Sequence, residues 1–279
     1  MLLIALPLLI GWLCTNAPAA EEEPQITLTV LTFNIMWEEN GVRAGNFSLP
    51  VWKDRATTVA KLIEDSNADI IGLQEASSEQ RENLQHLLPS YALIHHEATN
   101  NTNPILFRTG RFHKIDSGAF VLNKNPEIEG TNIGVRSSNW ANLKDRQTGQ
   151  PLWIYNLHLD HRSKGPTRQI SAVRLIQPTA THRGAVIVTG DFNCSENSPT
   201  MNFLHGNVPL DNDDGNLVTN QRPMVTAYKF VHPRTTDRVI DHVLVTSELQ
   251  TLSAGRIQSK TASDHDAFWA KVAHKGEAE

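Results

Sequence analysis

Polar side chains in this sequence stand at the ends of runs that have the character of buried strands, and this placement constrains the fold more than any other feature. The run 185–189 is apolar, for example, and Asp191 and Asn193 follow it closely. Open α/β sheets gather their sites at such strand ends. So many carboxylates and amides at one rim are costly without a cation or a substrate. The residues placed in this way are Asn34, Glu75, His158, Asp160, Asp191, Asn193, Asp241, Asp264 and His265.

Strand-like and helix-like stretches alternate along the chain, which predicts an α/β fold. With 39% hydrophobic and 20% charged residues, the composition is that of a globular protein with an ordinary core. No break in the pattern divides the chain into two domains. Helices are expected at 52–63, 77–88 and 167–181, the second opened by a capping box of Ser77 and Gln80. Strands are expected at 26–33, 69–73, 91–94, 105–107, 120–122, 153–157, 185–189, 239–246 and 267–272.

Residues 1–20 differ from the rest of the chain because they contain no Asp, Glu, Lys or Arg. An apolar run is followed by Ala17-Pro18-Ala19, which fits the small-residue rule for cleavage, so 1–20 is predicted to be a signal peptide of a secreted or periplasmic protein. The alternative, a membrane anchor, is disfavoured because the run is short for a bilayer. Of the two cysteines, Cys14 lies in this segment, which leaves Cys194 as a packing residue and no internal disulfide.

The chemistry of the polar set points to a hard cation. Carboxylate and amide oxygens, as in Glu75 and Asn34, suit Mg²⁺, Mn²⁺ or Ca²⁺, whereas zinc would prefer more His or Cys. His265 is a candidate general acid or base, with Asp241 to orient it. No nucleotide-binding loop and no nucleophile elbow is present. Carboxylates, a cation and histidine together are typical of phosphate ester hydrolysis by water.

Several motifs together resemble one family. They are Leu31–Asn34, Asp69–Glu75, Asn156–His161, Gly190–Asn193, Ile240–His242 and Ser263–His265. In this order they are similar to the endonuclease/exonuclease/phosphatase superfamily, which includes deoxyribonuclease I, and they extend over a domain of residues 26–272. Further segments, from Trp52-x-x-Arg55 to Arg168, resemble its secreted bacterial members. The resemblance implies two packed mixed β-sheets flanked by helices, a four-layer α/β/β/α sandwich.

The resemblance also implies roles for individual residues. Glu75 would be the main ligand of Mg²⁺ or Mn²⁺, with Ca²⁺ as an alternative, helped by Asn34 and with Asp264 near the same cation. Asp191 would orient the attacking water or hold a second metal, and whether Asp191 or His265 is the base stays open. The residues expected to contact or stabilise the phosphate are His158, Asn193 and His265, the last held by Asp241.

Some positions depart from the family pattern or keep two interpretations. Deoxyribonuclease-like members pair the first histidine with an acid, but residues 99–108 contain none, and Asn103 is the remaining candidate partner of His158. Asp160 has two interpretations, a residue that orients a histidine and a loop anchor, and His242 is expected on the opposite strand face from Asp241. Arg55 and Arg168 are either buried ion-pair residues or phosphate binders. The segment 211–215 is expected to be a turn, since its glycine is misplaced for a calcium-binding loop.

A strip of basic residues bears on the substrate. Arg162, Lys164, Arg168, Arg174 and Arg183 lie in 162–190, which has no Asp or Glu, although the net charge of the chain is −5. Such a strip could hold nucleic acid, or it could be the solvated face of a helix. The sequence therefore predicts a metal-dependent phosphodiesterase, first a nuclease. The alternatives are an enzyme acting on a phospholipid head group or small phosphate ester, and a non-catalytic binding protein. A monomer with no obligate protein partner is expected.

Overall fold

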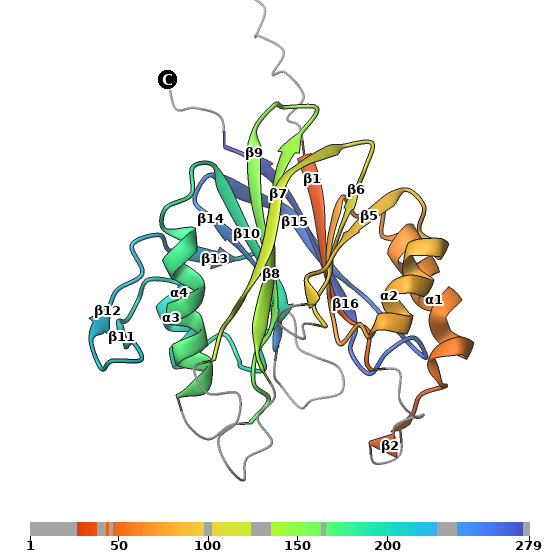
Figure 1. Ribbon diagram of the computed structural model, residues 1–279, viewed down its shortest axis with the longest axis horizontal. Helices are drawn as coiled ribbons and strands as arrows, with labels where there is room; N and C mark the ends of the chain where they lie inside the picture. Colours follow the sequence, from red (N-terminus) through yellow and green to blue (C-terminus); the bar gives the residue numbers. More distant parts are fainter. Residues whose placement is uncertain are drawn as a thin grey trace, which may run out of the picture.

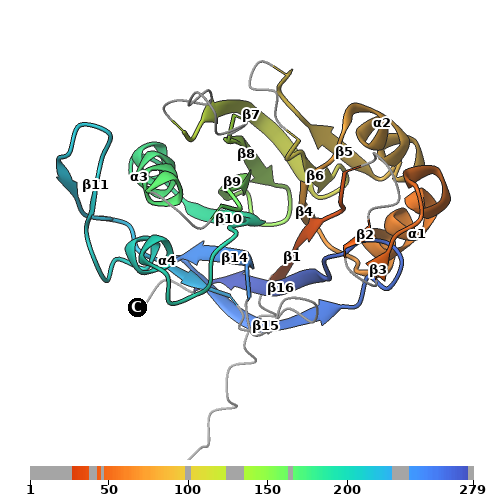
Figure 2. The same ribbon diagram turned by 90° about the horizontal axis from the view of Figure 1, so that it is seen from below.

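Two six-stranded sheets face each other, and helices cover their outer faces (Figures 1 and 2). The computed structural model describes residues 27–37, 43–44, 47–97, 102–123, 135–162, 166–227 and 239–275. The predicted signal peptide, 1–20, lies outside these residues. Helices α1 and α2 lie on one side of the pair of sheets, and α3 and α4 lie on the other. The described chain therefore has the four-layer α/β/β/α architecture that the sequence motifs implied.

The first sheet has the order β15-β16-β1-β4-β6-β5, and the second has the order β13-β14-β10-β9-β8-β7. The first consists of β1 (Thr27–Asn34), β4 (Ile70–Gln74), β5 (Tyr91–Ile94), β6 (Ile105–Arg108), β15 (Leu249–Ile257) and β16 (Ala267–His274). The second consists of β7 (Phe112–Val121), β8 (Ser137–Asp145), β9 (Pro151–His158), β10 (Ala185–Asp191), β13 (Met224–Thr226) and β14 (Asp241–Thr246). Short strands are β2 (Arg43–Ala44), β3 (Phe47–Ser48), β11 (Leu210–Asp211) and β12 (Leu217–Val218).

The helices are α1 (Trp52–Asp65), α2 (Ser78–Leu87), α3 (Thr167–Thr179) and α4 (Pro199–Leu204). The predicted capping box at α2 is confirmed: Ser77 Oγ accepts from the Gln80 amide at 3.2 Å, and Gln80 Oε1 accepts from the Ser77 amide at 2.9 Å. The three predicted helices are present. In the described part of the chain, no helix is both long enough and apolar enough to cross a bilayer.

Strand alternation divides the apolar residues into three layers. In β1, Leu28 and Val30 pack between the two sheets, whereas Leu31 and Phe33 pack under α1 and α2. A third layer lies between the second sheet and α3 and α4. Residues that alternate along one strand thus serve two different cores, which explains why these strands are nearly continuous apolar runs.

The layer between the sheets changes from apolar to polar along the strands. Beyond Val30 and Ile154, the next inward positions hold Thr32 and Asn156. Asn156 Oδ1 accepts from Gln74 Nε2 at 2.7 Å and from Thr189 Oγ1 at 3.1 Å, and all four polar side chains are buried. These hydrogen bonds join the two sheets and fix how the strand ends beyond them face each other.

Gly72 allows the two sheets to approach at this polar layer. A Cβ atom at Gly72 would lie 2.0 Å from Thr189 Oγ1 and 2.5 Å from Asn156 Oδ1. We expect Gly72→Ala to lower the free energy of unfolding by about 2–3 kcal/mol, because buried atoms joined by hydrogen bonds must move apart. Urea denaturation measures this change. Gly110→Ala is the matched control, since no atom lies within 4 Å of its added methyl group. Equal midpoints for the two variants would contradict the prediction.

Two long strands are absent from the sequence-based prediction, and a third is longer than expected. β8 contains buried polar residues, Ser137, Ser138 and Asn139, which hide its strand character. β15 is largely exposed, and most of β7 is also exposed or half-buried. Because the prediction relied on apolar runs, it found only 120–122 at the end of β7.

Candidate active site

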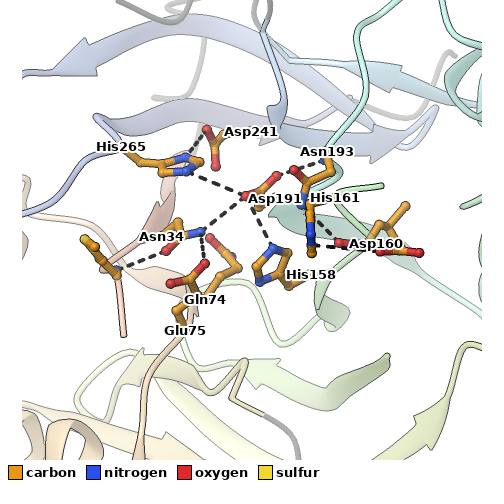
Figure 3. Close-up of polar contacts among 12 residues, drawn as sticks. Asn34, Gln74, Glu75, His158, Asp160, His161, Asp191, Asn193, Asp241 and His265 are labelled. Atoms are coloured by element: carbon orange, nitrogen blue, oxygen red, sulfur yellow. Dashed lines mark hydrogen bonds and ion pairs between the residues drawn. The ribbon is translucent and has the colours of Figure 1, made fainter. Parts of the chain in front are cut away.

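The ends of strands from both sheets meet at one edge of the molecule, and the predicted polar residues lie there (Figure 3). β1 runs parallel to β4, and β9 runs parallel to β10, so their carboxyl ends share this edge. β14 and β16 are antiparallel to their neighbours and contribute their beginnings. Asp191 is registered opposite His158 on one side and Asp241 on the other, which places these three side chains together.

Asp191 lies at the centre of the site. Its Oδ2 atom is 3.2 Å from Asn34 Nδ2, 3.6 Å from His158 Nε2 and 3.8 Å from His265 Nε2. Its Oδ1 atom accepts from the Asn193 amide at 2.8 Å. Burial raises the pKa of Asp191, and the charge of Asp241 raises it further, while the two imidazoles act in the opposite direction. A carboxylate in this position is a strong hydrogen-bond acceptor because little water competes for it.

The two histidines beside Asp191 differ in charge at neutral pH. Burial lowers the pKa of His158 to about 4, although Asp191 acts in the opposite direction. Burial also acts to lower the pKa of His265, but the charge and hydrogen bond of Asp241 raise it to about 10. His265 Nδ1 lies 2.9 Å from Asp241 Oδ2. The site therefore contains a neutral imidazole on one side of Asp191 and an imidazolium on the other.

The uncharged state of His158 agrees with the lack of an acid in the segment 99–108. Asn103 is buried and its amide donates to the Ser137 carbonyl at 3.2 Å. No carboxylate from that segment offsets the effect of burial on the pKa of His158, so the imidazole is held neutral.

Asn34 joins Asp191 to Glu75. Its Nδ2 atom donates to Glu75 Oε1 at 3.1 Å as well as to Asp191 Oδ2, and its Oδ1 atom accepts from the Met36 amide at 3.0 Å. Glu75 Oε2 accepts from the Trp37 amide at 3.0 Å. Glu75 and Asp191, which come from different sheets, thereby accept from the same side-chain amide of Asn34. Such an oxygen-rich arrangement suits a hard divalent cation.

A second group of side chains is compact enough for a metal ion. One ligand atom each from Asp191, Asp241 and His265 lies within 4.8 Å of the others. The charge of His265 lies beside Asp191 and Asp241, and the guanidinium groups of Arg55 and Arg136 interact with Glu75. Both groups of carboxylates therefore already face a cationic side chain, and the oxygen donors of either suit a hard divalent cation. Asp264, the third predicted ligand, is half-buried, and its Oδ1 atom is 3.4 Å from Ser263 Oγ.

The backbone is unusual where it presents the site. Met36, Glu75 and Asn193 have φ angles of 59°, 62° and 51°, in the left-handed region. For residues other than glycine this conformation costs about 1–3 kcal/mol each. Glu75 directly follows β4, whereas Met36 and Asn193 lie two residues beyond the ends of β1 and β10, and Glu75 and Asn193 line the cleft. Strain at these positions is therefore part of how the site is built.

The cleft has a volume of about 330 Å³, and Arg136 is one of its walls. The sequence analysis missed this residue because it precedes β8, a strand that was not predicted. Burial lowers the pKa of Arg136, while Asp160, Asp191 and Glu75 act to raise it. The lining residues are Trp37, Glu75, Thr102, Arg136, His158, His161, Asp191, Asn193 and His265. Arg136 therefore adds a guanidinium group to the lining of the cleft.

Arg55 and Arg168 donate to main-chain carbonyls. Arg55 is buried and donates to Met36 O at 2.7 Å and Ala262 O at 2.8 Å, so it braces the segments that carry Asn34 and His265. Arg168 donates to Asp160 O at 2.9 Å and to Arg162 O at 2.6 Å. Both arginines therefore have a structural role and hold the loops around the cleft in place.

Asp160 and His242 also have structural partners. The Asp160 carboxylate accepts from the amide of Arg162 at 3.2 Å and from its Nε atom at 3.1 Å, which favours the loop-anchor interpretation. His242 lies on the opposite face of β14 from Asp241, as alternation predicts. Its ring packs edge-on against Phe192 with centroids 5.4 Å apart, and Nε2 is 3.1 Å from Cys194 O.

The basic strip is largely engaged within the fold. Arg174 pairs with Asp213 at 2.6 Å, Arg162 pairs with Asp160 at 3.1 Å, and Arg168 binds carbonyls as above. Arg183 is exposed, and Lys164 lies outside the described residues. The segment 211–215 forms the predicted turn, in which Asn212 Oδ1 accepts from the amides of Asp214 and Asn216. Among the described residues, these contacts favour a structural interpretation of the strip.

The chain matches known proteins in sequence and in fold. Residues 31–265 match the Endonuclease/Exonuclease/phosphatase family. An endonuclease/exonuclease/phosphatase from Bacteroides vulgatus has 26% identity and a TM-score of 0.72, covering 90% of this chain and 100% of its own. A family protein from Bacteroides thetaiotaomicron has 20% identity and a TM-score of 0.72, covering 91% and 100%.

A mannosyl-6-phosphatase from Bacteroides thetaiotaomicron has 20% identity and a TM-score of 0.70, covering 88% of this chain and 99% of its own. No curated protein matches the chain in sequence. The family match extends over most of the chain and includes the strand-end residues described above. The chain therefore belongs to the Endonuclease/Exonuclease/phosphatase family and is a phosphoesterase of that family.

Proposed function

We propose that this phosphoesterase hydrolyses a small phosphate ester by attack of water, with a divalent cation held on Glu75 and Asn34. The observation that carries the proposal is the position of Asp191. Its carboxylate lies between a neutral and a charged imidazole and is joined to Glu75 through one amide. This arrangement offers an acceptor for a water proton and donors for phosphate oxygens on either side.

Mg²⁺ or Mn²⁺ fits the oxygen donors better than a softer metal. When bound, such a cation would neutralise charge on a phosphoryl oxygen. The Trp37 amide fixes the orientation of the Glu75 carboxylate, and the Met36 amide fixes that of the Asn34 side chain, whose Nδ2 atom donates to Glu75 and Asp191.

The remaining roles follow from charge and hydrogen bonding. The His265 imidazolium, held by Asp241, donates to a phosphate oxygen and stabilises negative charge that develops during attack. The neutral His158 lies on the other side of Asp191, with Nε2 3.6 Å from Asp191 Oδ2, and offers a hydrogen bond to a phosphate oxygen. Asn193 is fixed because its Nδ2 atom donates to Leu159 O at 3.0 Å and its main-chain amide donates to Asp191. Asp191 accepts the hydrogen bond that orients the water.

Two observations support a small ester over a polymeric substrate. The cleft volume of about 330 Å³ lies within the range of small-molecule sites. The basic strip, which was the argument for nucleic acid, has intramolecular partners at Arg162, Arg168 and Arg174. The shared fold leaves the substrate open, since similar structures include a mannosyl-6-phosphatase and D. rerio TDP2 complexed with a single-strand DNA product. Export of the protein is proposed from the composition of 1–20.

The proposal is tested with purified protein, each of Mg²⁺ and Mn²⁺, and EDTA controls. The substrates are p-nitrophenyl phosphate, bis(p-nitrophenyl) phosphate, a hexose 6-phosphate, a glycerophosphodiester and supercoiled plasmid DNA. We expect metal-dependent release of product from at least one small ester and no nicking at matched enzyme concentration. Nicking without turnover of the small esters would identify a nuclease instead. No hydrolysis of any substrate with either metal would overturn the proposed activity.

Arg136 is expected to bind the phosphate group. Arg136→Gln should lower kcat/KM by about tenfold to a hundredfold, mainly through a higher KM, because a charge-assisted hydrogen bond is lost. Steady-state kinetics on the best small ester measures the effect. The matched control is Arg146→Gln, because Arg146 is exposed and lies outside the cleft lining. An unchanged KM in Arg136→Gln would show that this guanidinium does not contact the substrate.

A further inference from the structure

A second and larger cavity, of about 600 Å³, lies on the outer face of the second sheet. It shares no lining residue with the catalytic cleft. Its floor is formed by β7, β8 and β9, and α3 stands beside it (Figure 2). Tyr155 in this cavity and His158 in the catalytic cleft are three residues apart on β9, or roughly 10 Å along the strand.

Aromatic rings form the wall of this cavity. Trp140 on β8 is registered opposite Tyr155 on β9, and Trp153 follows on the same face. The rings of Trp140 and Trp153 have centroids 5.7 Å apart, and His182 stacks on Trp153 at 3.4 Å with an interplanar angle of 3°. Phe120 meets Tyr155 edge-on at 6.2 Å. The wall is therefore an aromatic surface in which Phe120, Trp140, Trp153 and His182 are half-buried and Tyr155 is buried.

Gly118 sets the orientation of Trp140. It is registered opposite Trp140, and a Cβ atom at Gly118 would lie 2.7–2.8 Å from three atoms of the indole. These nearly equal distances show that the indole lies flat across the glycine. One ring face is covered by the strand, and the other faces the cavity that Trp140 lines. A flat, fixed aromatic face is a platform for a stacked ring, because little rotamer freedom is lost on binding.

The polar residues of the cavity carry no net charge. Arg174 Nη2 and Nε lie 2.6 and 2.8 Å from Asp213 Oδ2, which balances the two charges. Burial and the charge of Arg222 lower the pKa of His182 to about 4, so this imidazole is neutral near pH 7. Gln177 on α3 adds a carboxamide. A phosphate or an ammonium group would therefore find no complementary charge here, in contrast to the catalytic cleft.

We propose that this cavity binds an uncharged saccharide ring. The C–H groups of a pyranose face carry partial positive charge and stack on the negative face of an indole such as Trp140. Its hydroxyl groups need donors and acceptors at the rim of the platform, and Arg174, Asp213 and Gln177 supply both kinds. A cavity with apolar walls and a few convergent polar groups is typical of small-molecule sites. The inference is independent of the proposed activity.

Saturation-transfer NMR on the Asp191→Asn variant tests the proposal, because this measurement requires binding but no turnover. The probes are methyl α-D-mannopyranoside, maltotriose, cellotriose, adenosine and inorganic phosphate. We expect at least one saccharide to bind. Trp140→Phe should weaken that binding by about threefold to tenfold, and Gln177→Ala by about twofold to tenfold. Gln177 is exposed, so its substitution leaves the core intact.

The matched control is Trp269→Phe. Trp269 lies across Gly255 as Trp140 lies across Gly118, with a Cβ contact of 2.6 Å, but it belongs to the first sheet and does not line this cavity. Saccharide binding should be unchanged in this variant. The proposal is overturned if no saccharide binds, if only adenosine or phosphate binds, or if the Trp140 and Gln177 variants bind saccharide as tightly as the parent protein.

Discussion

Replacement of Asp191 by asparagine is expected to lower kcat/KM by a factor of about 10³ or more, because the acceptor that orients water loses its charge. Asn has nearly the same size, so the packing around residue 191 is kept, although its Nδ2 atom cannot accept a hydrogen bond as the two oxygens of Asp191 do from Asn34 and Asn193. Burial and the charge of Asp241 both raise the pKa of Asp191, which means that its ionised form is disfavoured in the native state. Asp191→Asn should therefore unfold at an unchanged or higher urea concentration.

The opposite signs of these two effects make the prediction specific. A loss of activity through misfolding would lower the unfolding midpoint, whereas loss of a catalytic carboxylate leaves it unchanged or raises it. Asp211→Asn is the control, since Asp211 is exposed and lies in the short strand β11. Full activity of Asp191→Asn on the small ester would show that water is oriented by another group.

Asp241→Asn and His265→Ala are each expected to lower kcat/KM by about 10²–10⁴. The reason is the hydrogen bond of 2.9 Å between Asp241 Oδ2 and His265 Nδ1, together with the charge that keeps the imidazole protonated. Without the Asp241 carboxylate, burial lowers the pKa of His265 against only the smaller opposing effects of Asp191 and Asp264, which favours the neutral form. The imidazole then no longer presents a positive charge to the phosphate.

A double-mutant cycle separates this mechanism from two independent contributions. If Asp241 acts through His265, the double variant is no slower than the slower single variant, because the second change removes nothing further. Steady-state kinetics on all four proteins gives the coupling. Multiplication of the two losses would mean that Asp241 acts on the substrate or the metal directly. Circular dichroism of each variant verifies that the fold is intact.

The alternation of strand-like and helix-like runs predicted the α/β class, and the resemblance of the motifs to a known family implied the four-layer architecture. Asn34 and Asp191 continue the inward-facing positions of apolar strands, and the order of the motifs implied two sheets. The apolar pattern does not reveal a strand that carries polar residues or faces solvent. β8 and β15 were missed for this reason, and with β8 the cleft residue Arg136 was missed as well.

Contacts between the sheets were beyond sequence reasoning for a different physical reason. The approach of Gly72 to Thr189 joins residues far apart in the chain, and no short-range pattern encodes it. The basic strip left two interpretations open, a surface for nucleic acid and the solvated face of a helix. Arg174 in α3 instead pairs with Asp213. The turn that contains Asp213 was predicted correctly, but its position beside α3 was not.

The left-handed backbone at Met36, Glu75 and Asn193 has a consequence for laboratory evolution of this protein. Glycine adopts this conformation without the steric penalty that the native side chains carry. A library screened only for heat tolerance would be drawn toward substitutions at positions that include Glu75, the proposed metal ligand, and Asn193, which lines the cleft. Thermal screening by itself would then enrich inert proteins, so turnover must be scored alongside survival from the first round.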